Sequence, residues 1–183
     1  MTGVRASNNN LATTVRDLFL DIIHQLGVIP SRIRGDHGVE NLLVAALMEE
    51  LQGIERGSYI WGRYVSSYMF YFLNDMLCRS VHNIRIERLW VDLTMGFGGK
   101  WKRFFQSLEL YDGLDIEINT HLWLVHHLFL NEINQDAQEW MGAWNNHPIS
   151  MRGQCQRSPK DLYFFSVVTD GSQGPAVEDV EVI

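Results

Sequence analysis

Two short acidic motifs, IRGDHGVEN and SVHNIRIERLW, contain carboxylates that could hold a divalent metal ion. Asp36 in the first motif follows the alternating residues 31 to 34, and a glycine lies on each side of the Asp36-His37 pair, which predicts a position at the end of a short strand. Glu87 in the second motif lies in a helical pattern and off its buried face, which is formed by Ile86, Leu89, Trp90 and Leu93. Because Mg2+ prefers carboxylate oxygens together with water and phosphate, this pair could serve two-metal phosphoryl transfer.

The same two residues also fit an ordinary structural interpretation. An aspartate after a strand commonly forms a turn or caps a helix, and a glutamate on a helix is commonly solvated. Residue type and position alone therefore leave both interpretations open.

A resemblance to a known family favours the metal interpretation. GDHGVEN resembles the second-aspartate motif of retroviral-type integrase and transposase catalytic cores, and HNIRIERLW resembles their glutamate helix. Residues 140 to 165 resemble the segment that follows in the same family, with Trp-Asn, His-Pro and Ser-Pro in order. The resemblance covers about residues 7 to 166 and is strongest to the integrase core domain proteins of transposon origin in eukaryotic genomes. It implies an α/β, ribonuclease H-like core.

The resemblance also implies a function and a set of site residues. In the family, Mg2+ or Mn2+ ions held by three carboxylates activate water or a DNA 3′-hydroxyl for polynucleotidyl transfer during integration. It implies that Asp36 and Glu87 are the catalytic metal ligands here, and that His37 and Asn41 line the site. The stretch from 80 to 110 has a local positive balance, which suits contact with DNA, whose phosphates dominate binding, but which could equally be ordinary surface charge. The candidate DNA-binding residues are Asn83, Arg85, Arg88, Lys100, Lys102 and Arg103.

The spacing of the two acidic residues departs from the family pattern. Asp36 and Glu87 are 51 positions apart, against about 35 in the family pattern for a two-metal site. The block 64 to 79 has the length of the excess, and its removal joins IWGR to SVHN as in the uninterrupted family sequence. We interpret it as a retained intron, which transcript sequencing tests; the alternative is a genuine mobile loop. It is interrupted by Asn74 and Asp75, so we expect no membrane span.

The first family carboxylate has no counterpart in this sequence. Residues 7 to 27 resemble the linker and helix that follow an N-terminal strand meander, and Asp17 and Asp21 lie on the solvated side of that helix. We therefore expect a helix-rich, N-terminally truncated fragment that lacks the meander and is inactive. Its exposed sheet edge would cause aggregation or pairing into a homo-oligomer. The apolar face of this helix is Leu11, Val15, Leu18, Phe19, Ile22, Ile23 and Leu26.

Composition agrees with one folded domain that is not secreted. The chain has 183 residues, 46% of them hydrophobic, and its two cysteines form neither a disulfide framework nor a zinc pattern. With no signal peptide, we expect a nuclear or cytoplasmic location. The net charge of −7 argues against a free-standing nucleic-acid binder. Part of this charge lies in residues 167 to 183, which we expect to form a disordered acidic tail.

The other elements are predicted mainly helical. We expect a helix over residues 39 to 52 that ends at Gly53, and a strand over 59 to 61. The predicted buried face of this helix is Val39, Leu42, Leu43, Ala46, Leu47 and Leu51. The Glu87 helix should break at Gly96, Gly98 and Gly99 and then resume, followed by a long helical region over 116 to 144. In that region we assign His121, His126 and His127 to the core or surface rather than to a metal, and Trp123, Trp140 and Trp144 to packing.

Two other functions remain open at this stage. The chain could be a non-catalytic nucleic-acid-binding or interaction relic of a mobile element, or a helical scaffold with no nucleic-acid partner. Metal titration separates the enzyme from the relic, and salt-dependent DNA binding separates the relic from the scaffold.

Overall fold

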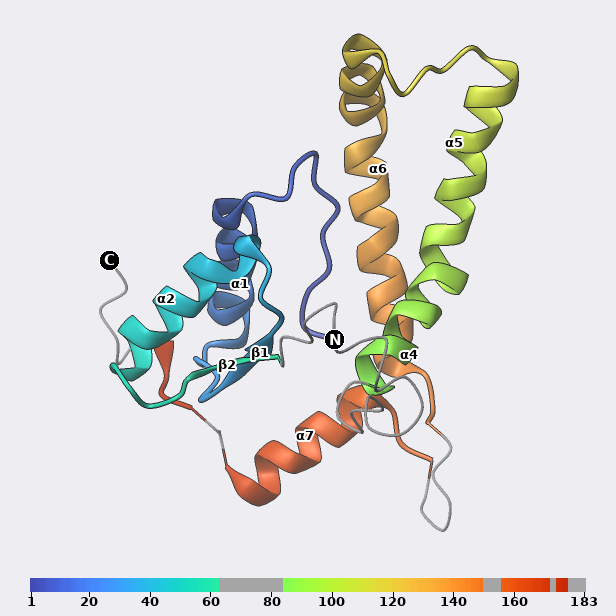
Figure 1. The fold of residues 1–183 in the computed structure, drawn as a ribbon. Coiled ribbons are helices and arrows are strands. Elements are labelled where there is room, and N and C mark those ends of the chain that lie inside the picture. The colour runs from blue at the N-terminus through green and yellow to red at the C-terminus, as the bar shows by residue number, and fades with distance from the viewer. Residues whose placement is uncertain (63–83, 150–155, 172–173, 178–183) are drawn as a thin grey trace, which may run out of the picture. The chain divides into compact units, whose positions relative to one another are not determined.

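A computed structural model describes residues 1–62, 84–149, 156–171 and 174–177 (Figure 1). The predicted insertion 64 to 79 lies outside the described residues. The chain divides into two compact units, one formed by residues 1–64 and 141–183 and the other by residues 65–140. Each unit is described by itself below.

In its described part, the first unit contains a β-α-β arrangement and further helices. Its elements are α1 (Ala12–Leu26), β1 (Ile33–Gly35), the 3-10 turn η1 (Val39–Asn41), α2 (Leu42–Gln52), β2 (Tyr59–Trp61) and α7 (Pro159–Asp170). β1 and β2 are parallel, with Ile33 opposite Tyr59 and Gly35 opposite Trp61. The predicted strands and the predicted end of the second helix at Gly53 are confirmed. α1 ends at Gly27, whose positive φ of 67° suits a residue without a Cβ.

The core of the first unit joins α1, α2 and β2. Its fully buried side chains include Ile23, Ile29 and Met48, with Val44, Ala45 and Tyr59 beside them. The prediction for the buried face of α2 was wrong in part, because Val39 and Leu42 are 74% and 54% exposed and Ala46 is exposed too. The α-helix begins only at Leu42, after the 3-10 turn, and its inward stripe is centred on Val44, Ala45 and Met48. On α1, Leu11 and Leu26 are also exposed, contrary to prediction, because they lie at the two ends of the helix.

The described residues of the C-terminal segment contact the first unit. Residues 167–170 form the last turn of α7. The Ile29 amide donates to the Pro175 carbonyl at 3.0 Å, and the Val177 amide donates to the Gly27 carbonyl at 3.2 Å. Val177 also packs on the core. The predicted disordered acidic tail over residues 167 to 183 stays a prediction.

The second unit is helical in its described part. α4 (Ile84–Leu93) continues through the π-helical turn η2 (Thr94–Gly98) into α5 (Gly99–Tyr111), and α6 (Asn119–Asn146) follows, belonging to this unit up to Trp140. The predicted break at the glycines is thus a π turn, not an interruption. A Cβ on Gly96 would lie 2.3 Å from the Trp140 indole nitrogen, so glycine lets α6 approach this turn.

Some aromatic side chains of this unit are not packed as predicted. Trp90 and Trp123 are 61% and 64% exposed. Trp123 stacks on His127 one turn later on α6, with ring centroids 5.0 Å apart.

Among the described residues, no helix combines the length and the hydropathy that a bilayer crossing requires.

Candidate functional site

Asp36 lies directly after β1, as predicted, with an exposed side chain. Its Oδ1 accepts a hydrogen bond from the Asn41 side-chain amide at 2.8 Å and a longer one from the Gly38 backbone amide at 3.3 Å. These bonds fix the turn between β1 and η1. Asn41, predicted to line the site, thus orients the carboxylate, whose Oδ2 faces no hydrogen-bond donor among the described residues.

Aromatic rings support the turn that carries Asp36. The His37 ring stacks on Trp61 with centroids 5.2 Å apart and planes 12° apart, and Trp61 tilts against Tyr59 at 4.5 Å. The backbone continues the same pairing, since the Gly62 amide donates to the Gly35 carbonyl at 2.7 Å. The residues after β1 are therefore held against the end of β2.

Tyr59 lies closest to the strand end that presents Asp36. An added Cβ on Gly35 would lie 1.8 Å from the Tyr59 hydroxyl, so the hydroxyl occupies the space that a side chain there would need. Burial raises the pKa of Tyr59, and the negative charges of Asp36 and Glu40 raise it further. The hydroxyl is therefore protonated at neutral pH beside two carboxylates.

Glu87 lies on α4, which confirms its predicted helical position. Its side chain lies outside the described residues, and α4 belongs to the second unit whereas Asp36 belongs to the first. The structure thus shows that Asp36 follows a strand and that Glu87 lies on a helix. The joint metal site stays a prediction.

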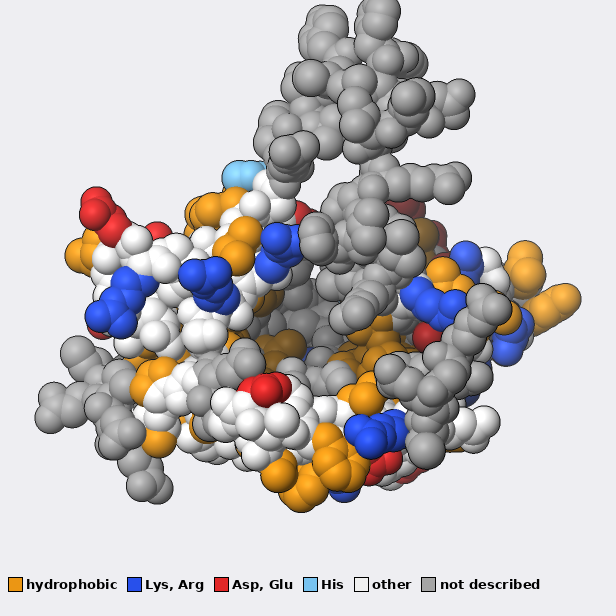
Figure 2. Space-filling view, turned by 90° about the horizontal axis from the view of Figure 1, so that it is seen from below, with side chains coloured by type: hydrophobic (Ala, Val, Ile, Leu, Met, Phe, Trp, Pro, Cys, Tyr) orange, Lys and Arg blue, Asp and Glu red, His pale blue; other side chains and the backbone are white. Residues whose placement is uncertain are grey.

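The predicted DNA-binding residues have different surroundings. Asn83 and the side chain of Arg85 lie outside the described residues, whereas Arg88, Lys102 and Arg103 are exposed. Lys100 forms an ion pair with Asp136, its Nζ lying 2.6 Å from Oδ2, so its charge is partly neutralised within the protein. Figure 2 shows, on one face of the molecule, exposed hydrophobic side chains next to Lys and Arg side chains.

The comparison with protein families supplies the decisive observation. The family model described as "Integrase core domain" matches residues 1–71 and 72–175, which is nearly the whole chain. The chain belongs to the integrase core domain family. The resemblance to retroviral-type integrase and transposase cores is thereby confirmed. No curated protein and no solved structure shows significant similarity to it.

The family implies a divalent metal, and Asp36 fits such an ion by its chemistry. It offers an exposed carboxylate oxygen, of the kind that Mg2+ and Mn2+ prefer, at a strand end held by Asn41. Among the described residues, however, no three His, Cys, Asp or Glu side chains form a group that could hold a metal. The described part of this integrase core domain therefore provides one suitable metal ligand and not a complete set of metal ligands.

Three residues beside Asp36 were not predicted from the sequence. Glu40 is part of the quoted motif and lies four positions after Asp36, so this short separation could have suggested a second carboxylate. Tyr59 and Trp61 were predicted only as strand residues. Their position depends on the pairing of β1 with β2, for which the sequence carries no direct signal.

The Lys100 and Asp136 pair gives a testable pH dependence. The hydrogen bond from Lys100 holds the pKa of Asp136 below its ordinary value, assisted by the Trp101 indole and opposed by partial burial. A lowered folded-state pKa adds stability above the ordinary carboxyl pKa of about 3.9, and this stability disappears as the pH falls through the lowered value. We expect Asp136→Asn to be less stable than the original protein near neutral pH, and this difference in the free energy of unfolding should disappear in acid. Urea denaturation of both proteins across this pH range measures the difference. A difference that does not change with pH would contradict a lowered pKa of Asp136.

Proposed function

We propose that this integrase core domain takes part in polynucleotidyl transfer on DNA, with Asp36 and Glu87 as ligands of Mg2+ or Mn2+. The observation that carries the proposal is the Asp36 carboxylate, which is exposed after β1 and oriented by Asn41 in a chain of this family. A ribonuclease H-like arrangement of the core and a nuclear or cytoplasmic site of action belong to the same proposal.

The residues of this chain have distinct parts in the proposed function. Asp36 and Glu87 would hold the ion, which when bound supplies charge stabilisation at a phosphodiester. Asn41 keeps Oδ1 of Asp36 engaged in a hydrogen bond, so that Oδ2 would be the oxygen that holds the ion. The exposed cations of Arg88, Lys102 and Arg103 would contact DNA phosphates.

Metal binding tests the proposal without requiring turnover. We expect weak Mn2+ binding in calorimetry, and Asp36→Asn should weaken it at least about tenfold, because a direct ligand matters no less than an outer-shell partner. Asp17→Asn is the matched control, since Asp17 is also exposed but pairs with Arg16 on α1. Equal losses of Mn2+ affinity in the two variants would mean that Mn2+ responds only to the net charge of the protein, and the proposed site would be abandoned.

A DNA cleavage assay completes the test. We expect no nicking or strand transfer by the chain as given, because a two-metal mechanism needs a further bridging carboxylate. Turnover that both Asp36→Asn and Glu87→Gln abolish would overturn this expectation and show a complete site.

The alternative is non-catalytic: the chain binds nucleic acid or a partner without reacting. Salt-dependent DNA binding that is unchanged by Asp36→Asn and by chelation would support this alternative.

A further inference from the structure

The two long helices of the second unit leave an open groove between them. Figure 1 shows α5 and α6 as splayed, antiparallel helices joined by a loop. Side chains bridge the gap, and beside them lies a groove of about 530 Å³. This groove is formed by residues of the second unit only.

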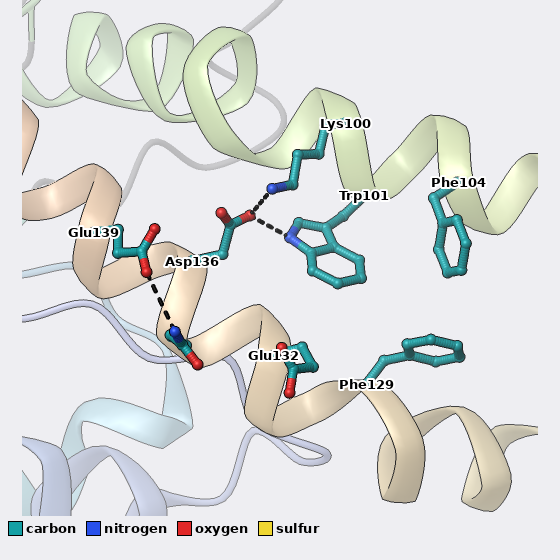
Figure 3. A pocket seen from close by; sticks show the side chains of 8 residues that line it. Lys100, Trp101, Phe104, Phe129, Glu132, Asp136 and Glu139 are labelled. Carbon is teal, nitrogen blue, oxygen red and sulfur yellow. Dashed lines mark hydrogen bonds and ion pairs between the residues drawn. The ribbon is translucent and has the colours of Figure 1, made fainter.

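An aromatic cluster forms the apolar wall of the groove. Phe104 of α5 and Phe129 of α6 meet edge to face with centroids 5.1 Å apart, and Trp101 packs 5.8 Å from Phe104 (Figure 3). Phe104 remains 37% exposed. A wall of interlocked rings offers apolar area at little cost in side-chain entropy.

Asp136 fixes this wall in place. Its Oδ2 accepts hydrogen bonds from the Lys100 ammonium at 2.6 Å and from the Trp101 indole nitrogen at 2.7 Å (Figure 3). Both bonds join α5 to α6. The carboxylate of Asp136 and the charge of Lys100 are thus used within the protein.

Two further carboxylates line the groove without a cation. Glu132 and Glu139 are exposed on either side of Asp136, and no described Lys, Arg or His forms an ion pair with either one. Glu139 accepts only a weak hydrogen bond from Gln135 at 3.3 Å. At about 1.5 Å rise per residue, the two glutamates stand roughly 10 Å apart along α6.

We propose that the α5–α6 groove docks a cationic, amphipathic helical segment of a partner protein. Its apolar side chains would lie on Phe104 and Phe129, and two Lys or Arg side chains about two turns apart would pair with Glu132 and Glu139. DNA does not fit the groove, because three carboxylates against one ammonium repel phosphates. A purely apolar segment would leave both glutamates unpaired beside it. The proposal does not depend on metal binding or on DNA chemistry.

A synthetic helical peptide of leucines and lysines tests the groove. We expect the full chain to bind it in calorimetry, and Glu132→Gln with Glu139→Gln should weaken binding about five- to tenfold, as two exposed ion pairs allow. Phe104→Ala should also weaken binding. The matched control is Glu49→Gln with Glu50→Gln, which removes the same charge from exposed positions on α2 and should leave binding unchanged. Circular dichroism verifies that every variant keeps its helical content.

Each other outcome overturns the proposal. Equal weakening in the Glu49 and Glu50 variant would mean attraction by net charge alone. Equal binding of a peptide with glutamate in place of lysine would exclude recognition by charge. Direct binding of duplex DNA to the chain that Phe104→Ala weakens would make the groove a nucleic-acid site. If sedimentation shows a dimer that the Glu132 and Glu139 substitutions dissociate, the occupant is a second copy of this chain instead.

Discussion

Met48→Ala is expected to lower the free energy of unfolding by about 2–5 kcal/mol, the range for truncating a fully buried large apolar side chain. Met48 has no exposed surface and lies among Ile23, Ile29 and Val44, where α1 meets α2. Truncation loses the transfer free energy of its side chain and leaves a cavity that the two helices cannot fully close. Urea denaturation followed by circular dichroism measures the change.

Met95→Ala provides the matched control for this experiment. Met95 has the same side chain but is 81% exposed in the π turn. We expect its substitution to change stability by no more than about 0.5 kcal/mol, as at other surface positions. A similar loss in both variants would show that Met48 does not lie in the core described here.

Gly35→Ala is expected to destabilise the protein by about 1–3 kcal/mol, the usual cost of overpacking. The new Cβ would lie 1.8 Å from the Tyr59 hydroxyl and 2.9 Å from the ring carbon that carries it. Tyr59 is only 8% exposed, so its ring cannot move aside without disturbing the core. Since Asp36 follows Gly35, we also expect weaker Mn2+ binding.

A second substitution isolates the cause of this effect. Tyr59→Phe removes the hydroxyl, so the double variant with Gly35→Ala should lose less stability than the sum of the two single variants. Gly142→Ala is the matched glycine control, because a Cβ there meets nothing within 4 Å on α6. It should be neutral or stabilising by up to about 1 kcal/mol, since alanine favours a helix. Additive losses from Gly35→Ala and Tyr59→Phe would exclude the hydroxyl as the obstacle.

Local signals in the sequence determined the helices, the strands and the family. The periodicity of residues 11 to 26, followed by Gly27, predicted α1, and Gly53 marked the end of α2. Asp36 was predicted at a strand end from the alternating residues before it, and it lies there. These features depend on residues a few positions apart, so periodicity and glycine placement are sufficient to find them.

Only the tertiary structure decided how these elements meet. The inward stripe of α2 at Val44 and Met48, the Tyr59 hydroxyl against Gly35, and the pairing of residues 27–29 with 175–177 each join segments distant in the sequence. Helical periodicity allows several neighbouring stripes, and burial against α1 selects one of them. Likewise, the charge of Lys100 predicted a DNA contact, which stays a prediction, and only the structure shows that α6 brings Asp136 to Lys100, so that this charge also helps to fix the aromatic wall. The sequence determines the chemistry of each side chain, whereas packing between elements determines which residue that side chain contacts.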